Sequence, residues 1–313
     1  MYYIGVDVSK KALSVFDGEH DLEFKNTAGL KAFKRYLKKQ YTSFDKLGII
    51  FEATGIYSEC LQAFCARYQI KAFILNPKQS HNFARSLGRR SKTDTIDART
   101  IYAYQTLIKK EKLQVPVANP EAKRLAGYLT SYQFAQKQRV SLSNHLESIQ
   151  DKALLRLLKQ ELKRAQRLED QLLSEIKAYI QDHPKLQEDF QRLLTISGIG
   201  EKLAVTLLAL FVHYQGTNRA QVTALVGLDP IEKTSGTSVK GKPKISKNGN
   251  RHIRKMLYMP TLCAIKNNQK ITIFYQRLIA HHKPKKVAVI ACMRKLLLFA
   301  HAIYRNQTEY VAI

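Results

Sequence analysis

Four acidic residues in the first hundred positions have the types and spacing of a metal-binding set. Asp7 lies in the apolar run IGVDVS, where a buried carboxylate would cost on the order of several kcal/mol unless it were paired or bound to metal. Glu52 closes a second apolar run, LGIIFE, and Asp94 and Asp97 are three positions apart, so on a helix they would share one face. Such oxygen ligands suit Mg²⁺, with Mn²⁺ as the alternative. A pair of these ions can clamp the attacking and leaving oxygens of a phosphodiester.

Each acid taken alone also has a structural explanation. Asp7 could pair with a lysine, Glu52 could simply end a strand, and Asp94 could cap a helix. The arrangement of all four is more informative, because a first strand, a middle strand and a later helix are where RNase H-like phosphoryl-transfer folds place their metal ligands. We therefore expect the four carboxylates to converge.

A glycine-rich basic segment, residues 227–258, contains the second candidate for chemistry. Its repeated Gly and Pro residues predict no regular structure before about His252, so we expect a phosphate-binding loop that leads into a helix. Lysines around Ser235 could lower the cost of an alkoxide that attacks phosphorus. Composition alone favours an ordinary loop serine for Ser235, and equally for Ser238. The cations expected to contact nucleic acid are Lys240, Lys242, Lys244, Lys247, Arg251 and Arg254.

The run LLTISGIGEKLAVTLLA places Gly198 and Gly200 between two apolar helical stretches. This pattern is typical of a helix-hairpin-helix, in which backbone N–H groups at a helix N-terminus bind a phosphate without reading sequence. A plain tight turn is the alternative.

The net charge indicates a polyanionic partner. The 313 residues carry 52 Lys and Arg against 25 Asp and Glu, a formal charge of +27. A compact protein with this surplus would repel itself unless it normally met nucleic acid, with an anionic membrane as the second choice. The stretch from Lys233 to Thr308 contains 17 Lys and Arg and no Asp or Glu, so the basic surface is concentrated in the second half.

The hydrophobic pattern divides the chain into three parts. Residues 1–115 alternate short β-rich runs with amphipathic helices, which predicts an α/β domain with a central mixed sheet. Residues 116–184 are almost continuously helical, with apolar residues at spacings of three and four, and predict a long coiled-coil arm through which the chain self-associates. Residues 185–313 predict a mostly α-helical domain. The apolar positions of the arm are Leu142, Leu146, Ile149, Ala153, Leu158, Leu162, Ala165, Leu168, Leu172 and Ile176.

Two further features exclude other classes of protein. The four cysteines show neither CxxC spacing nor the density of a disulfide framework, so buried thiols are expected. No apolar run approaches the 18 or so residues of a spanning helix, and the N-terminal run MYYIGVDVSKK contains an acid where a signal peptide has none. We expect a cytoplasmic protein with no membrane partner.

The motifs in their order resemble one family. The segments GVDVSK, FEATGIY, SKTDTIDA, ISGIG, GLDP, SGTS and ISKNGNRHIRKMLY resemble the DEDD transposases of bridge-RNA-guided insertion sequences, relatives of the Piv-type DNA invertases. The resemblance covers nearly the whole chain. It implies a RuvC-like N-terminal domain joined by a coiled coil to a transposase domain that carries a nucleophilic serine.

The resemblance also assigns residues and partners. It implies that Asp7, Glu52, Asp94 and Asp97 hold Mg²⁺ and that Ser235 forms a covalent phosphoserine intermediate. Double-stranded donor and target DNA would be the substrates, and a structured noncoding bridge RNA would pair with both. The chain would form a dimer through the coiled coil and a tetramer when active, in a bacterial cytoplasm in association with the nucleoid.

Three alternatives remain open at the level of sequence. An RNase H-like nuclease or resolvase would cut DNA through activated water, with Ser235 incidental. A non-catalytic RNA-binding or architectural protein would keep its nucleic-acid affinity without Asp7 and Glu52. A Piv-like invertase without guide RNA shares every motif.

Overall fold

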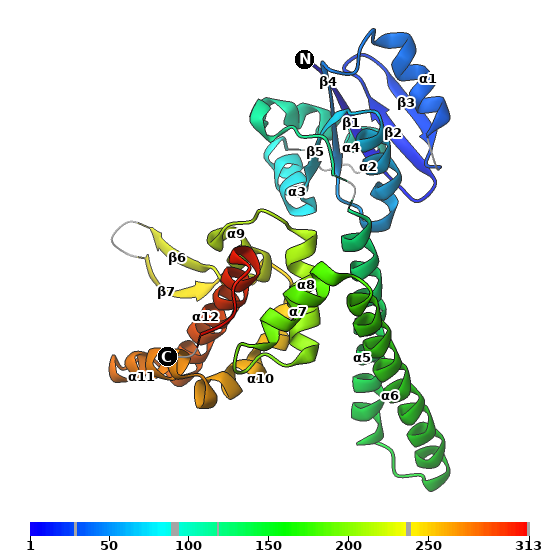
Figure 1. The fold of residues 1–313 in the computed structure, drawn as a ribbon. Helices are drawn as coiled ribbons and strands as arrows, with labels where there is room; N and C mark the ends of the chain where they lie inside the picture. Colours follow the sequence, from blue (N-terminus) through cyan, green and yellow to red (C-terminus); the bar gives the residue numbers. More distant parts are fainter. Residues whose placement is uncertain (28–29, 89–93, 118, 236–238, 312–313) are drawn as a thin grey trace. The chain divides into compact units, whose positions relative to one another are not determined.

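The computed structural model describes residues 1–27, 30–88, 94–117, 119–235 and 239–311 (Figure 1). Within these ranges, the side chains of residues 94–96, 110, 233–235 and 239–242 are not described. The chain divides into two compact units, Met1–Ala118 and Asn119–Ile313, called here the N-terminal and C-terminal units. The predicted division into three parts, with an arm at 116–184, stays a prediction.

A five-stranded mixed sheet forms the centre of the N-terminal unit. The strand order is β3-β2-β1-β4-β5, in which β1, β4 and β5 are parallel and β2 and β3 join as an antiparallel meander. The predicted mixed sheet is thus confirmed. The strands are β1 (Tyr2–Val8), β2 (Ala12–Phe16), β3 (Asp21–Lys25), β4 (Leu47–Glu52) and β5 (Lys71–Leu75).

Alternating side chains of this sheet bury against two different layers of helices. Ile4 and Val6 of β1 lie in one apolar cluster with Phe33 of α1 and Leu61 of α2. Because successive residues of a strand face opposite sides, Tyr3, Gly5 and Asp7 face the other layer, where α4 packs. The helices are α1 (Lys31–Gln40), α2 (Glu59–Arg67), α3 (Pro77–Ser86) and α4 (Asp94–Ala103), with short 3₁₀ turns at Gly55–Ser58, Tyr104–Leu107 and Lys110–Lys112.

The C-terminal unit begins with a long helical hairpin of α5 (Pro120–Leu146) and α6 (Lys152–Gln181) (Figure 1). Both helices have side-chain N-caps: Asn119 accepts a hydrogen bond from the Ala122 amide, and Asp151 accepts one from the Leu154 amide. The two helices pack against each other within one chain. Coiled-coil pairing between chains stays a prediction.

The apolar stripe predicted along α6 differs from the structure at Ala153 and Leu168, which are both exposed. Ala165 and Ile176 are buried as predicted, but Leu168 is 41% exposed. The next residue, Glu169, takes the buried position and is 3% exposed. Its carboxylate accepts hydrogen bonds from Tyr132 and Arg139 of α5, which supply the polar partners that a buried charge needs.

The rest of the C-terminal unit is a helical bundle around α8, which is buried along most of its length. Nothing among the described residues tests whether the α7–α8 connection acts as a helix-hairpin-helix. The helices are α7 (Pro184–Leu194), α8 (Glu201–His213), α9 (Arg219–Val226), α10 (Arg251–Asn267), α11 (Gln269–Ala280) and α12 (Lys285–Asn306).

Helix α12 is long and apolar enough to cross a membrane by length and composition, which the sequence analysis did not anticipate. Half of its most apolar stretch is buried inside the protein. Leu296, Leu297 and Ala300 are fully buried in the core of the C-terminal unit. These features are typical of the core helix of a globular unit.

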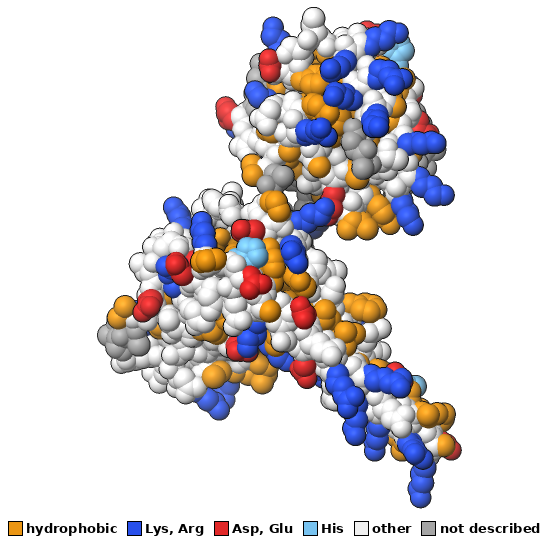
Figure 2. All heavy atoms as spheres, turned by 45° about the vertical axis from the view of Figure 1, so that its right-hand side comes forward, with side chains coloured by type: hydrophobic (Ala, Val, Ile, Leu, Met, Phe, Trp, Pro, Cys, Tyr) orange, Lys and Arg blue, Asp and Glu red, His pale blue; other side chains and the backbone are white. Residues whose placement is uncertain are grey.

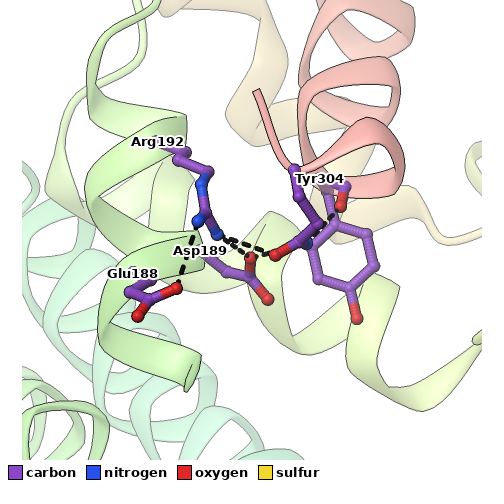
Figure 3. Close-up of polar contacts among 5 residues, drawn as sticks. Glu188, Asp189, Arg192 and Tyr304 are labelled. Atoms are coloured by element: carbon purple, nitrogen blue, oxygen red, sulfur yellow. Dashed lines mark hydrogen bonds and ion pairs between the residues drawn. The ribbon is translucent and has the colours of Figure 1, made fainter. Parts of the chain in front are cut away.

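A polar cluster joins α7 to the end of α12 (Figure 3). Asp189 is 1% exposed and accepts hydrogen bonds from Arg192 at 2.9 Å and from the Gln307 amide at 2.8 Å. Arg192 also donates to Glu188 at 3.1 Å. Burial, followed by the nearby Asp189 charge, raises the pKa of Tyr304 to about 12. The cluster therefore fixes the last turn of α12 on α7 through buried, paired charges.

The expectation that no regular structure precedes His252 is wrong. Residues Pro230–Ser235 form β6 and residues Val239–Ile245 form β7, and the two strands pair as an antiparallel ribbon. Pro230 is the first residue of its strand, and Pro243 lies in a sheet of only two strands, where both strands are edges and a missing N–H is tolerated. Gly and Pro residues, read as loop signals, here occur within a hairpin.

Candidate functional site

The carboxylates of β1 and β4 lie at the same edge of the sheet. The two strands are parallel, with Val6 paired to Phe51, and Asp7 and Glu52 are the next residues on each strand. Both side chains are half-buried. Since the strands run in the same direction, these acids meet at the carboxyl end of the sheet, where open α/β sheets build their sites.

Both acids also belong to the face that α4 covers. Gly5 and Asp7 are two positions apart on β1, and Ile50 and Glu52 are two positions apart on β4, so each pair shares a face. Ile50 lies in the apolar cluster that contains Ile101 of α4. Asp7 and Glu52 therefore lie on one face and at one edge.

Gly5 allows α4 to approach this face at backbone distance. A Cβ on Gly5 would come 2.4 Å from the Ala98 carbonyl oxygen and 2.4 Å from the Tyr102 amide nitrogen, so only glycine fits. Asp97 directly precedes Ala98 and is half-buried. Asp94 is the first residue of α4, one turn before Ala98. The first turn of α4 thus lies on the same face of the sheet as Asp7.

An ion pair and an aromatic contact hold α4 in this position. Arg99 donates to the Asp21 carboxylate from β3, with Nε 3.0 Å from Oδ1. The hydrogen bond and charge of Arg99 lower the pKa of Asp21. The guanidinium also lies 5.0 Å from the centre of the Phe16 ring, and Tyr102 packs edge-on against the same ring.

The donor set fits a hard divalent cation, because all four predicted ligands are carboxylates. Asp7, Glu52 and α4 come to one side of the sheet, but the side chain of Asp94 lies outside the described residues. No cluster of three or more metal-binding side chains occurs among the described residues. Assignment of Asp7, Glu52, Asp94 and Asp97 as a metal tetrad therefore stays a prediction.

Ser235 is the last residue of β6 and pairs with Val239 of β7. Its side chain, and the whole of Ser238, lie outside the described residues. The backbone nevertheless places Ser235 at the turn end of the ribbon. A nucleophile at the end of a strand in a basic two-stranded ribbon would be presented to a partner, whereas a nucleophile inside the bundle would be enclosed.

The base of the ribbon is held by the GLDP and SKNGN motifs, which pack on each other. A Cβ on Gly249 would come 2.4 Å from the Gly227 nitrogen, and Gly227 has a φ of 70°, so both positions require glycine. The Ser246 hydroxyl donates to the Asp229 carboxylate, and the amide of Asn250 donates to the Leu225 carbonyl at 2.7 Å. These contacts fix the base of the ribbon, where β6 starts and β7 ends, beside α9 and α10.

The predicted phosphate-binding cations occupy different environments. Lys244, Lys247 and Arg251 are exposed, in keeping with contact to a polyanion. Arg254 is half-buried, and its guanidinium donates to the Val226 carbonyl at 2.7 Å, so it has a structural partner at the base of the ribbon. The side chains of Lys240 and Lys242 lie outside the described residues.

The two glycines of the ISGIG turn also lie in different environments, one closely packed and one exposed. Gly198 has a φ of 104°, and a Cβ there would come 2.6 Å from the Ala264 Cβ of α10, so close packing requires this glycine. Gly200 is exposed and precedes α8, with no atom near the position of a Cβ. Phosphate binding at Gly198 and Gly200 stays a prediction.

His252 is a candidate functional residue that the sequence analysis did not single out. It lies in the first turn of α10, and its Nε2 is buried without a hydrogen-bond partner among the described residues. Burial, and then the charge of Lys255, lower the pKa of His252 and favour the neutral imidazole. The only sequence signal for His252 was its place where the glycine-rich basic segment leads into a helix.

Comparison with known proteins relates both units to DNA-rearranging enzymes. A transposase family model of the IS110 DEDD type matches residues 4–155, and the model for the transposase IS116/IS110/IS902 family matches residues 190–276. The chain contains two IS110-family transposase domains. The first match includes Asp7, Glu52, Asp94 and Asp97, and the second includes Ser235.

Three curated relatives agree with these matches. The pilin gene-inverting proteins of Moraxella bovis and Moraxella lacunata are each 27% identical over 98% of this chain and 97% of their own length. An uncharacterized 43.6 kDa protein of insertion element IS110 from Streptomyces coelicolor is 25% identical over 44% of this chain and 33% of its own length. The chain is therefore a DNA recombinase of the transposase and invertase type, and its DEDD domain implies a divalent metal cofactor.

Proposed function

We propose that the chain catalyses Mg²⁺-dependent strand exchange between donor and target DNA through a covalent phosphoserine intermediate on Ser235. The observation that carries the proposal is that the first turn of α4, which contains Asp97, packs on the face of the sheet to which Asp7 of β1 and Glu52 of β4 belong. The assignment of Ser235 as the nucleophile is supported by its position as the last residue of β6, in a basic ribbon whose base is fixed to α9 and α10.

Ser235 acts as the nucleophile in this scheme. Its Oγ forms a bond to phosphorus, the bond from phosphorus to a deoxyribose oxygen breaks, and the hydroxyl proton passes to solvent or a nearby base. Reversal of the step on a different DNA end releases the serine and joins the new strand. Energy of the phosphodiester is conserved, so strand exchange needs no nucleotide cofactor.

The carboxylates of Asp7, Glu52, Asp94 and Asp97 hold the metal. The chemistry that a divalent cation supplies at such a site is polarisation of the scissile phosphate. In this scheme the N-terminal unit is RuvC-like, the metal is Mg²⁺, and the four carboxylates are its ligands.

Recognition of sequence is assigned to a bridge RNA that pairs with donor and target DNA. Delegation of base readout to RNA leaves the protein to bind shape and backbone, for which exposed cations such as Lys244, Lys247 and Arg251 suffice. Each dimer forms through the coiled-coil arm of α5 and α6, and the active assembly is a tetramer of two dimers with catalytic sites shared between subunits. It works in the bacterial cytoplasm, at the nucleoid.

The experiment that tests the proposal is a trap for the covalent intermediate. Wild type, Ser235→Ala and Ser238→Ala proteins are incubated with Mg²⁺, copurified RNA and labelled DNA, then denatured and resolved for DNA-linked protein. An adduct that is lost only in Ser235→Ala supports the proposal. Metal-dependent cutting by Ser235→Ala, with no adduct in wild type, would overturn it in favour of a nuclease that activates water.

A second candidate function is site-specific inversion of DNA without a guide RNA. The observation that favours it is the 27% identity, over nearly the whole of both chains, to proteins named for pilin gene inversion. Removal of copurified RNA by ribonuclease separates the two. Strand exchange that persists at the untreated rate favours the invertase, and exchange that is lost and returns with added RNA favours the RNA-guided enzyme.

A further inference from the structure

A row of five cations runs along one side of α6. Their spacings of four, three, four and four residues place them within about 80° of arc around the helix, over a length of about 22 Å. All five are exposed, and the row lies beside the face that packs on α5. The members of this row, called here the α6 basic stripe, are Lys152, Arg156, Lys159, Lys163 and Arg167.

The α6 basic stripe has no acidic partners within the part of the chain that the structure describes. None of its members forms an ion pair there, whereas Arg164, which lies outside the stripe, pairs with Glu161 at 2.6 Å. Like charges three and four residues apart on a helix destabilise it. An uncompensated row of this length therefore indicates an anion that is absent from the isolated chain.

Side chains of the stripe themselves line a shallow, open hollow on the surface of α6. Its volume is ≈ 450 Å³, and its lining includes Lys152, Arg156, Lys159 and Lys163. Figure 2 shows Lys and Arg side chains gathered along the end of the hairpin that contains the α5–α6 turn. Four of the six side chains in the lining are Lys or Arg, and no acidic side chain is among them, so the charge of the lining suits an anionic partner.

We propose that the α6 basic stripe binds the phosphodiester backbone of a nucleic-acid duplex. The inference rests on the proposed function to the extent that nucleic acid is the partner, and adds a binding surface on the hairpin. Duplex DNA carries one negative charge per roughly 1.7 Å, so about 13 charges face a stripe of about 22 Å. Five aligned cations can therefore all find phosphates.

Composition favours backbone contact over base recognition. No aromatic residue occurs in α6 before Tyr179, so the stripe has no ring on which an unpaired base could stack. Lysine and arginine contacts to phosphates position a duplex without reading its sequence. Duplex DNA and duplex RNA share this chemistry, and the experiment separates them.

The test compares two variants of the full-length protein that lose the same charge. In the stripe variant, all five members of the α6 basic stripe are changed to Gln. The control variant neutralises five exposed cations taken from separate elements. The control changes are Lys25→Gln, Lys71→Gln, Lys112→Gln, Arg219→Gln and Lys283→Gln.

Binding to labelled 30-base-pair DNA and RNA duplexes of unrelated sequence is measured by fluorescence anisotropy over a range of salt. Each phosphate contact contributes about 0.9 to the slope of log K against log salt for B-DNA. We expect the stripe variant to lose up to about 4.5 from this slope and at least about tenfold in affinity, with a change below about 1 for the control. The duplex with the larger loss identifies the partner.

Two further measurements keep the result interpretable. Circular dichroism establishes that both variants fold, and a variant with each stripe Lys changed to Arg and each stripe Arg changed to Lys should retain wild-type binding. Equal losses in the stripe and control variants would overturn the proposal, because net charge alone would explain them. A changed oligomeric state by light scattering, with unchanged binding, would also overturn it and would make the stripe a subunit contact. Ser235→Ala protein should bind normally, so failure of the catalytic proposal is distinguishable.

Discussion

Gly5 of β1 lies directly against Ala98 of α4, where a Cβ would come 2.4 Å from the Ala98 carbonyl oxygen. The contact joins the strand that carries Asp7 to the helix that carries Asp97. Backbone atoms on both sides leave no flexible side chain to move away. The spacing between these two elements, and with it the position of the carboxylates, therefore depends on the absence of one methyl group.

Gly5→Ala should lower both stability and activity. The added methyl forces α4 away from β1, at a cost of about 1–3 kcal/mol for overpacking, and displaces Asp97 relative to Asp7. Chemical denaturation and a strand-exchange assay measure the two effects. The control is Gly127→Ala, where no atom lies near the new Cβ and a helix interior gains up to about 1 kcal/mol from alanine. Wild-type activity in Gly5→Ala would disprove the role of this contact.

The sequence predicted the elements of the N-terminal unit well, because its strands and helices have clear periods. Ile4 and Val6 alternate with Gly5 and Asp7, and this alternation matches the two buried faces of the sheet. The close approach at Gly5 could not be predicted. It depends on which helix packs over β1, and α4 is more than eighty residues away in sequence.

Two features of the C-terminal unit show why local patterns fail. The apolar pattern of the sequence predicted a buried Leu168, but Glu169 is buried instead, because Tyr132 and Arg139 of α5 donate hydrogen bonds to its carboxylate. The Gly- and Pro-rich segment forms β6 and β7 because pairing between the two strands supplies hydrogen bonds that composition does not reveal. In the first case the deciding partners lie on another helix, and in the second the deciding partner is the other strand of the same hairpin.

Glu169→Gln should destabilise the hairpin. The Glu169 side chain is 3% exposed and has Tyr132, Arg139 and Lys202 as partners, so loss of its charge leaves Arg139 without a buried anion. The side chain of Arg139 is 31% exposed and that of Lys202 is 52% exposed. Because solvent screens such partners, the expected loss of unfolding free energy is only about 1–3 kcal/mol. Urea denaturation measures it. Glu161→Gln on the same helix, in an exposed pair, should change stability by less than about 0.5 kcal/mol.

The same carboxylate should contribute to acid sensitivity. Burial acts to raise the pKa of Glu169, but Arg139, Lys202 and Tyr132 outweigh it, and the net pKa is below the ordinary 4.5. A lowered pKa in the folded state stabilises the protein above pH 4.5, and this contribution is lost as pH falls through the folded pKa. The difference in unfolding free energy between wild type and Glu169→Gln should therefore be largest near neutral pH and narrow below about pH 4.5. A difference that grows on acidification would contradict this account.

Arg192→Met should loosen the junction between α7 and α12 (Figure 3). The change leaves the buried Asp189 carboxylate with Gln307 as its remaining side-chain partner among those that the structure describes. Removal of one partner from a buried pair costs about 3 kcal/mol, which lowers the Tm of a unit of this size by roughly 6–12 °C. Differential scanning calorimetry measures the shift. Glu188→Gln removes the exposed partner of the same guanidinium and should leave Tm almost unchanged.

Chelation of divalent metal should abolish strand exchange but not duplex binding. The predicted ligands lie in the N-terminal unit, and the exposed cations that would contact phosphates need no metal. Excess EDTA should remove activity, and added Mg²⁺ or Mn²⁺ should restore it. Asp97→Asn should reduce the rate by about a hundredfold, because loss of even an outer-shell partner of a metal ligand costs about 10–100-fold in metal affinity or activity. Asp45→Asn, at an exposed loop position of the same unit, is the matched control. Strand exchange near the wild-type rate in Asp97→Asn would exclude that residue from the metal site and leave the assignment to Asp7, Glu52 and Asp94.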